Sequence, residues 1–255
     1  SLDNIDKFKS DEELKPLVNA LLQQKKKQKM LDKQKKQFTA NVSHELKTPL
    51  TSIAGYAELI ETGMAKPEDI KPFAGVIRKQ ALRLVNLSED IIQLSQLEES
   101  DDEDMSFESV NLYEIAQRCV EALNINAINK CVTLNLTGEE CYIRGKAQLV
   151  EELVYNLCDN AIRYNKENGN VTVTVTPLEK GASVSVKDTG IGIPEKYQER
   201  IFERFFRVDK SRSKATGGTG LGLAIVKHIT QLHDAKLEIS SEEGKGTEII
   251  VTFKD

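Results

Sequence analysis

Apolar residues in the first hundred positions recur every three or four residues, which is the spacing that forms one face of an α-helix. The clearest apolar stripe comprises Val42, Leu46, Leu50, Ile53, Ala57 and Ile60. After Gly63 and Pro67, a second stripe comprises Ile70, Phe73, Ile77, Ala81, Leu84, Leu87, Ile91 and Leu94. The pattern predicts two long helices joined by a short connection. Because one hairpin cannot bury both stripes, we expect two copies to form a homodimeric four-helix bundle.

A weaker stripe precedes this hairpin, because glutamine and lysine occupy several of its seam positions. Its apolar members are Leu14, Leu17, Leu21, Leu31 and Phe38. The pattern predicts a weak coiled coil. We interpret the mostly basic run at 25–36 as the solvated face of this helix, in preference to a surface for membrane or nucleic acid. The mostly acidic run at 98–104 predicts an exposed linker and hence a domain boundary.

The pattern after this linker alternates between helices and strands. Helices are predicted from Asn111, which can cap its own helix, to about 124, at 147–164, after Pro194 and at 220–233. Strands are predicted at 131–136, 141–143, 171–178, 182–187, 236–240 and 247–253. The whole chain is therefore predicted to be α+β. Its helical hairpin precedes an α/β sandwich whose mixed sheet carries helices on one face.

The composition is that of a soluble globular protein, because 39% of the 255 residues are hydrophobic and 29% are charged. A net charge of −5 is too small to indicate a nucleic-acid partner. The four cysteines form no C-x-x-C pair and no zinc spacing, so we expect reduced thiols in a cytoplasmic protein. No apolar run is long enough to cross a bilayer. Membrane attachment is expected only through an upstream segment absent from this chain.

Residues 43–51 contain the first candidate for chemistry, a histidine followed by a carboxylate. A neutral imidazole such as that of His44 can act as a nucleophile near neutral pH. The neighbouring Glu45 can orient the ring or accept its proton. Four residues advance a helix by roughly 400°, so Thr48 returns to the face of His44. His44 lies two residues from both Val42 and Leu46, so we expect it to point away from the buried stripe.

A second candidate is a row of polar residues on the helix predicted at 147–164. Glu152, Asn156 and Asn160 are spaced by four and therefore share one face. Mg²⁺ prefers hard oxygen ligands, which amide oxygens and nucleotide phosphates supply. The spacing alone is also compatible with a solvated helix face.

Two glycine-rich segments follow. Asp188-Thr-Gly-Ile-Gly192 comes directly after a strand, where glycines allow a planar ligand to approach and a carboxylate can accept a hydrogen bond from an amine. Residues 217–222 open a helix, where backbone N–H groups attract phosphate. No strand precedes this second segment and no P-loop occurs, so a Rossmann or P-loop site is disfavoured. Between the segments lie an aromatic stretch at 202–209 and a polar, basic stretch at 210–216.

In this order, the motifs resemble the H, N, G1, F and G2 boxes of the sensor histidine kinases of two-component signalling. The resemblance covers residues 38–255. It implies a HisKA-type dimerisation and phosphotransfer hairpin at 38–98. An acidic linker at 99–106 would lead to an ATP-binding domain of the gyrase, Hsp90 and MutL type at 107–255. Residues 1–37 resemble a signalling-helix or HAMP-type linker.

The resemblance assigns a role to each residue of the N box. Asn160 matches the magnesium ligand, and Asn156 matches a second polar contact near the phosphates. Glu152 matches the acidic position one turn earlier and is a second candidate for the metal. Arg163 stands where the family usually has lysine, so its charge is kept but its contact geometry differs. Tyr164 matches an aromatic residue near the nucleotide.

The other boxes imply the remaining contacts. Asp188 matches the aspartate that reads the adenine amino group. The stretch at 210–216 matches a mobile lid over the triphosphate, with Arg207 and Arg212 as candidates to neutralise γ-phosphate charge. The glycine boxes add Gly190, Gly192, Gly218, Thr219, Gly220, Leu221 and Gly222 to the implied nucleotide site.

The implied activity is autophosphorylation of His44 from Mg-ATP, followed by transfer to an aspartate of a separate response-regulator receiver domain. Thr48 matches a position that helps to dephosphorylate that regulator, so phosphatase activity is also expected. Two other functions stay open at this point: a phosphatase or degenerate kinase that binds ATP only to set its conformation, and a non-kinase ATPase of the same fold. A purely structural coiled-coil dimer would leave the glycine boxes without a role.

Overall fold

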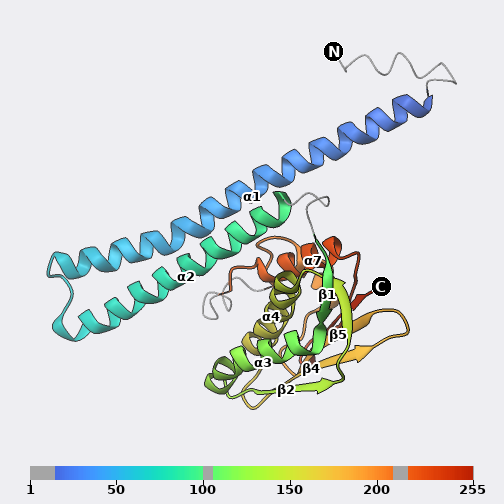
Figure 1. Ribbon diagram of the computed structural model, residues 1–255. Helices are drawn as coiled ribbons and strands as arrows, with labels where there is room; N and C mark the ends of the chain where they lie inside the picture. Colours follow the sequence, from blue (N-terminus) through green and yellow to red (C-terminus); the bar gives the residue numbers. More distant parts are fainter. Residues whose placement is uncertain (1–14, 100–105, 209–217, 255) are drawn as a thin grey trace. The chain divides into compact units, whose positions relative to one another are not determined.

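The computed structural model of the chain describes residues 15–99, 106–208 and 218–254. They belong to two compact units that meet within one helix, between Ala81 and Leu82 (Figure 1). The domain boundaries expected at 37/38, 98/99 and 106/107 stay predictions.

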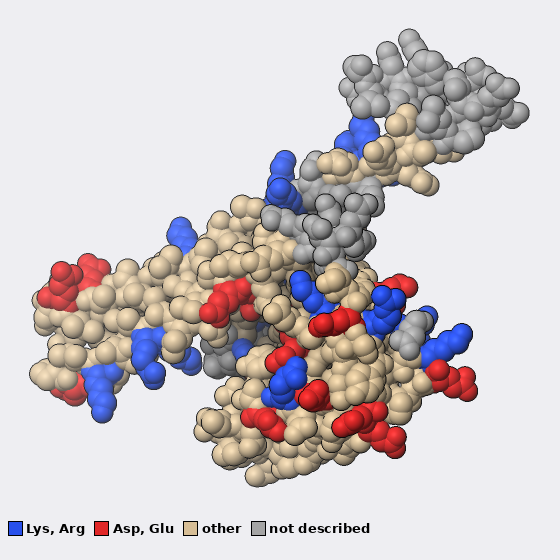
Figure 2. Space-filling view, in the orientation of Figure 1, with Lys and Arg blue, Asp and Glu red and all other residues tan. Residues whose placement is uncertain are grey.

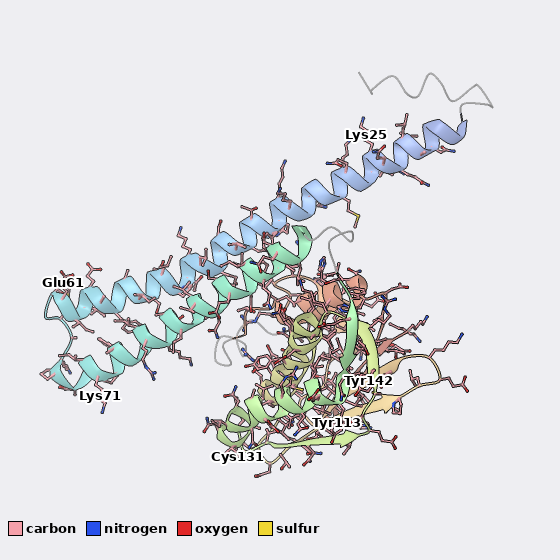
Figure 3. The ribbon with its side chains drawn as sticks, in the orientation of Figure 1. Lys25, Glu61, Lys71, Tyr113, Cys131 and Tyr142 are labelled. Carbon is pink, nitrogen blue, oxygen red and sulfur yellow. The ribbon has the colours of Figure 1, made fainter. Side chains whose placement is uncertain are left out.

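The first unit contains α1 (Lys15–Glu61) and the first half of α2 (Pro67–Glu99). The two helices run antiparallel, and the rings of Tyr56 and Phe73 meet with their centroids 4.9 Å apart. Gly63 makes the turn with a positive φ of 71°, and Pro67 opens α2 at a position where its missing N–H leaves no bond unmade. Figure 3 shows Glu61 and Lys71 at the same end of this hairpin. The predicted helical hairpin is therefore confirmed.

Much of the apolar surface of these helices is uncovered. Leu50 on α1 and Ile70 on α2 are 53% and 45% exposed. The second half of α2, which belongs to the second unit, carries Leu82, Val85 and Ile92, each more than half exposed. Large apolar side chains in a row on a helix are normally covered by a partner. The uncovered row fits the predicted bundle of two copies.

The second unit is built on a mixed sheet of five strands in the order β2-β4-β5-β7-β6. β2 and β4 pair in parallel, whereas the other neighbours are antiparallel. The sheet strands are β2 (Thr133–Gly138), β4 (Asn170–Pro177), β5 (Ala182–Asp188), β6 (Lys236–Glu242) and β7 (Gly246–Phe253). A separate pair joins β1 (Glu108–Asn111) to β3 (Tyr142–Gly145).

Three helices cover one face of this sheet: α3 (Leu112–Asn129), α4 (Ala147–Arg163) and α7 (Gly222–Leu232) (Figure 1). The sequence dictates which face, because Val171, Val173 and Val175 are buried while the alternate Thr172 and Thr174 are not. The short helices α5 (Glu195–Gln198) and η3 (Arg200–Phe202) lie between β5 and α7 in the chain. The predicted α/β sandwich with helices on one face is confirmed.

Most element ends lie within two residues of the sequence-based expectations, but the region between α3 and β2 and the strand β1 differ more. α3 continues five residues beyond the expected end at 124, and Cys131, with a positive φ of 54°, then turns the chain so that β2 begins at Thr133. β1 was not expected, because its four residues show no apolar alternation. Asn111 caps α3 as predicted, since its side chain accepts hydrogen bonds from the N–H groups of Tyr113 and Glu114.

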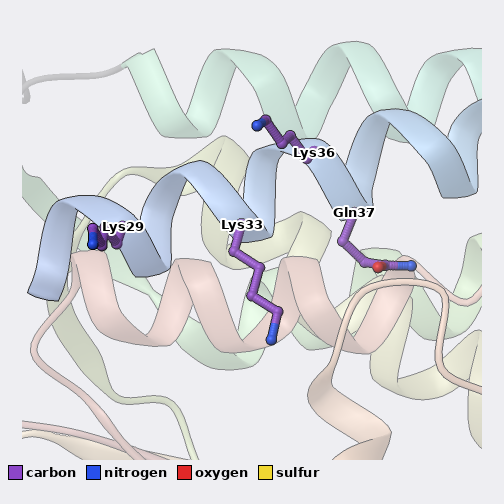
Figure 4. Close-up of a pocket in the computed structure, with 4 residues that line it drawn as sticks. All are labelled: Lys29, Lys33, Lys36 and Gln37. Carbon is purple, nitrogen blue, oxygen red and sulfur yellow. The ribbon is translucent and has the colours of Figure 1, made fainter.

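The basic stretch of α1 forms a shallow groove of about 550 Å³ lined by Lys29, Lys33, Lys36 and Gln37. These side chains extend from different sides of a single helix (Figure 4), and all four are exposed. Positive and negative side chains are interspersed on the visible face of the molecule (Figure 2). The groove is therefore best described as a solvated helix face. No helix in the described ranges has both the length and the apolar composition of a membrane span.

Candidate functional site

A cavity of about 930 Å³ lies within the second unit. Its walls come from the polar face of α4, the segment after β5, the strand β7 and the residues just before α7. The predicted site residues that line it are Asn156, Asn160, Arg163, Tyr164, Asp188, Gly192, Arg207, Gly218, Thr219, Gly220 and Gly222. Segments more than sixty residues apart in the chain therefore meet at one cavity.

Asn156 and Asn160 on α4 face this cavity, because the opposite face of the helix is apolar and buried, from Val150 to Ile162. The side-chain amide of Asn156 donates to the carbonyl of Glu152 at 3.0 Å, and that of Asn160 donates to the carbonyl of Asn156 at 2.8 Å. Each amide nitrogen is thus held by its own helix. The Oδ1 atoms of both asparagines are left available to a ligand among the described residues.

Asp188 ends β5 and is held from two sides. Its Oδ1 accepts hydrogen bonds from the N–H of Gly190 at 2.7 Å and from the N–H of Thr247 at 3.3 Å. Burial raises the pKa of the Asp188 carboxyl, while these two hydrogen bonds act in the opposite direction. No hydrogen bond from a described residue uses Oδ2. A fixed carboxylate with one available oxygen can accept a hydrogen bond from a ligand amine.

Two glycines after Asp188 let the chain pass where no side chain fits. A Cβ atom at Gly190 would lie 2.4 Å from the carbonyl oxygen of Tyr164. A Cβ at Gly192, which has a positive φ of 65°, would lie 1.9 Å from the carbonyl oxygen of Glu242. Gly190 is buried behind the cavity wall, and Gly192 lies on it. Gly190 thus brings the segment after β5 against Tyr164, and Gly192 brings it against Glu242.

The glycines before and within α7 pack against the N box. A Cβ at Gly222 would lie 2.6 Å from Oδ1 of Asn156, and one at Gly218 would lie 3.4 Å from Nη1 of Arg163. The backbone at Gly220 accepts a hydrogen bond from the N–H of Phe205 at 2.8 Å. Leu221, by contrast, is fully buried and does not line the cavity. The structure thus brings the N box, the aromatic stretch at 202–209 and the glycine segment before α7 into contact.

Positively charged side chains line the cavity. Arg163 forms an ion pair with Asp159 at 2.5 Å, one turn earlier on α4. Arg207 and Lys130 also line the cavity. Arg212 and the rest of 209–217 lie outside the described residues. The arrangement of hard oxygens on α4, glycine N–H groups and cationic side chains fits a polyphosphate ligand.

Matches to family models agree with this geometry. Residues 145–255 match the histidine kinase-, DNA gyrase B- and HSP90-like ATPase model, and residues 34–100 match the His Kinase A (phospho-acceptor) domain model. The chain belongs to the sensor histidine kinases of two-component signalling. Its two family domains account for the two groups of motifs in the sequence, one on α1 and one around the cavity.

Individual relatives support the assignment to this family. The chain is 36% identical over 230 residues to the sensor histidine kinase WalK of Bacillus subtilis, a match that covers 89% of this chain and 38% of the relative. It is 33% identical over 237 residues to the sensor protein kinase WalK of Staphylococcus aureus, covering 92% of this chain and 57% of the relative. The chain therefore spans between about two fifths and three fifths of the length of these relatives.

A solved structure shares the fold. The crystal structure of histidine kinase ThkA in complex with response regulator protein TrrA superposes with a TM-score of 0.68 over 86% of this chain and 61% of that chain. The sequence identity is 24%, so this likeness concerns the fold alone.

The predicted phosphoacceptor His44 lies in the first unit, within the residues that match the His Kinase A model. His44 is exposed on α1, as its distance from the apolar stripe predicts. Thr48 is also exposed, and its hydroxyl donates to the carbonyl of His44 at 3.3 Å. Glu45 is partly buried. In the described residues, the three side chains are thus neighbours on one helix, close to the buried Pro49.

Glu152 has different surroundings from the two asparagines. It does not line the cavity, and its side chain is hydrogen-bonded to Gln93 of α2. Burial, with a smaller contribution from the nearby Asp90, raises the pKa of the Glu152 carboxyl to about 7, although the hydrogen bond with Gln93 acts in the opposite direction. No cluster of three or more His, Cys, Asp or Glu residues in the described ranges can hold a metal without help from a ligand. The available oxygen of Asn160 fits Mg²⁺ that is also bound by phosphates; a metal role for Glu152 stays a prediction.

The sequence did not reveal the apolar wall of the cavity. Ile191 and Ile193 flank Gly192, and their position in the glycine motif is a signal that could have been read. Thr247 and Ile249 come from β7, and only the pairing of β7 with β5 brings them next to Asp188. Lys130, at the end of α3, gave no signal at all.

Proposed function

We propose that this chain is a histidine kinase core that transfers the γ-phosphoryl group of ATP to His44 and passes it on to an aspartate of a response regulator. The observation that carries the proposal is the convergence of Asp188, Asn160 and the Gly218–Gly222 segment on one cavity, in a chain that presents an exposed histidine on a separate helix.

The cavity offers a partner for each part of the nucleotide. The available oxygen of Asp188 accepts the exocyclic amine of adenine, and the apolar side chains of Ile191 and Ile249 pack on the ring. The N–H groups of the Gly218–Gly222 segment and the guanidinium group of Arg163 meet the phosphates. Asn160 would hold Mg²⁺, which when bound would neutralise phosphate charge.

The transfer step needs a nucleophile, a proton acceptor and positioning. A ring nitrogen of neutral His44 attacks the γ-phosphorus, and the bond from that phosphorus to the β,γ-bridging oxygen breaks so that ADP leaves. The proton on the attacking ring passes to Glu45. Phosphoryl transfer asks little covalent work of the protein, so alignment and charge neutralisation by Arg207 supply most of the acceleration. The exposed position of His44 makes it accessible to a nucleotide held by another unit.

Two copies of the chain are proposed to pair through the uncovered apolar rows of α1 and α2, which gives the four-helix bundle. The proposed recipient of the phosphoryl group is the receiver domain of a response regulator. The related fold of ThkA has been solved in complex with the response regulator protein TrrA, which supports this class of partner.

A phosphatase activity toward the phosphorylated regulator is a second proposed function. The exposed hydroxyl of Thr48 lies one turn from His44 and keeps its lone pairs available, since it acts as a donor in its own helix. This hydroxyl can align a water molecule for attack on a phosphoaspartate bound at the same face.

Incubation with γ-labelled ATP and Mg²⁺ tests the kinase proposal, with His44→Gln as the matched variant. We expect label that is stable in base, labile in acid and absent from the variant, which should still bind ATP. Phosphate release without labelled protein would favour the ATPase function, and ATP binding without either product would favour the degenerate kinase.

A further inference from the structure

The second half of α2 reaches the nucleotide cavity through one short hydrogen bond. The hydroxyl of Thr219 donates to Oδ2 of Asp90 at 2.6 Å. Asp90 and Thr219 belong to the same compact unit, although 129 residues separate them. Asp90 lines the cavity, and so does its neighbour Glu89. A carboxylate from α2 is therefore placed at the segment that is proposed to bind phosphate.

The hydrogen of the Thr219 hydroxyl is fully committed by this contact. The oxygen of the same hydroxyl accepts a hydrogen bond from the N–H of Leu221 at 3.2 Å. A hydroxyl has a single hydrogen to donate. A phosphate oxygen can therefore receive that hydrogen only if Asp90 gives it up.

The charged side chains that surround Asp90 would also surround a phosphate group bound at Thr219. The positive charge of Arg163 is close enough to lower the pKa of the Asp90 carboxyl, although burial, the largest effect, raises it. Arg163 in turn lies against Gly218. Glu89 and Asp159 are the negative groups that act on Asp90. A phosphate at Thr219 and Arg163 would add a like charge at short range, which is unfavourable in a partly buried site.

Further contacts hold α2 in this position. The carbonyl of Leu97 is 3.0 Å from Nε2 of His228 on α7, and Gln93 is hydrogen-bonded to Glu152 on α4. Asp90 is the one of these α2 residues that lines the cavity. The other contacts hold α2 in place, and Asp90 places a negative charge at the cavity.

We propose that Asp90 competes with the nucleotide phosphates. Its carboxylate accepts the hydrogen of the Thr219 hydroxyl and interacts with the positive charge of Arg163, so that the α2 contact and a bound triphosphate exclude each other. The inference rests on the proposed nucleotide site. Because coupling between two binding events is reciprocal, ATP releases the second half of α2 by the same factor by which the α2 contact weakens ATP binding.

The test is calorimetric titration of the whole chain with ATP, ADP and adenosine, comparing the wild type with Asp90→Ala. The matched control is Glu89→Ala, which removes the same charge from the adjacent cavity-lining position but no hydrogen bond to Thr219. Asp90→Asn serves as a second variant, because it keeps the size of the side chain and an acceptor for Thr219 while removing the charge. Thermal unfolding of each variant verifies that it is folded.

We expect Asp90→Ala to bind ATP about fivefold more tightly or better, Asp90→Asn to gain in the same direction, and Glu89→Ala to change little. Adenosine affinity should be the same in all four proteins, since adenosine carries no phosphate. If the wild type binds ATP and Asp90→Ala binds it no more tightly, the proposal is overturned. An equal gain for adenosine would also overturn it, because α2 would then block the cavity as a whole. Absence of ATP binding in all proteins would instead contradict the proposed nucleotide site, and the inference with it.

Discussion

Replacement of Asp188 by asparagine isolates the proposed adenine contact from the fold. Oδ1 of Asp188 is held by the N–H groups of Gly190 and Thr247, and an asparagine can keep its own Oδ1 at that position. Its amide nitrogen then takes the place of Oδ2. An adenine amine that approached an acceptor in the wild type meets a donor in Asp188→Asn, so binding is lost while the structural hydrogen bonds remain.

The size of the loss follows from the charge of the acceptor. A hydrogen bond to a charged group contributes about 1.5–3 kcal/mol, and an unmatched donor adds to the loss. The dissociation constant for ATP should therefore rise about 10- to 150-fold. Guanine presents an acceptor oxygen where adenine presents an amine. The preference for ATP over GTP should thus fall even further than the affinity for ATP.

Isothermal titration with ATP and GTP at pH 7.5 measures both effects. Glu243→Gln is the matched control, because Glu243 also lines the cavity but is exposed and has no place in the adenine contact. A change below about threefold in ATP affinity, with Asp188→Asn folded, would refute the reasoning, since even a neutral hydrogen bond contributes about 0.5–1.5 kcal/mol.

Three further substitutions test other parts of the site. Gly222→Ala should weaken ATP binding without unfolding the chain, because its Cβ would lie 2.6 Å from the Asn156 side-chain oxygen; calorimetric titration with ATP measures this. Glu152→Gln should raise the melting temperature more at pH 8 than at pH 5. The folded-state pKa of about 7 lies above the ordinary value of 4.5 for a glutamate carboxyl, so the unfolding free energy of the wild type falls as pH rises through that window. An equal gain at both pH values would contradict the burial of the ionised carboxyl. Thr48→Ala should slow regulator dephosphorylation by about tenfold or more while autophosphorylation of His44 changes little; equal losses would indicate a packing role.

The sequence predicted most of the fold because its patterns are local. The apolar stripe of α1 and the alternation of Val171, Val173 and Val175 each specify an element and its buried face. The start of β2 was misplaced because it depends on the backbone of Cys131, whose positive φ no local pattern announces. β1 was missed because it is short and mostly polar, and its pairing with β3 joins residues far apart in the chain.

Some residues of the candidate site could likewise be predicted from local sequence, and others could not. Asp188, Asn160 and the glycine boxes could be found because they are contiguous motifs. Thr247 could not, since it reaches Asp188 only through the register of β7 against β5. Asp90 could not either, because its helix reads as part of the hairpin, and a contact across 129 residues leaves no trace in helical periodicity.

The position of Asp90 could couple the packing of the helical hairpin to the binding of nucleotide at the cavity. α2 is one continuous helix from Pro67 to Glu99, so the residues that pair with α1 and the residue proposed to compete with phosphate lie on a common element. A change in packing that favours the contact between Asp90 and Thr219 must lower the affinity for ATP. Bound ATP must in turn weaken that contact by the same factor. A stimulus that shifts the packing of α2 by 1.4 kcal/mol would change ATP affinity about tenfold. Such a change needs no rearrangement of the sheet or of α4, because the competing group is carried by α2. The same helix can therefore respond to a signal from the hairpin and report nucleotide occupancy back to it.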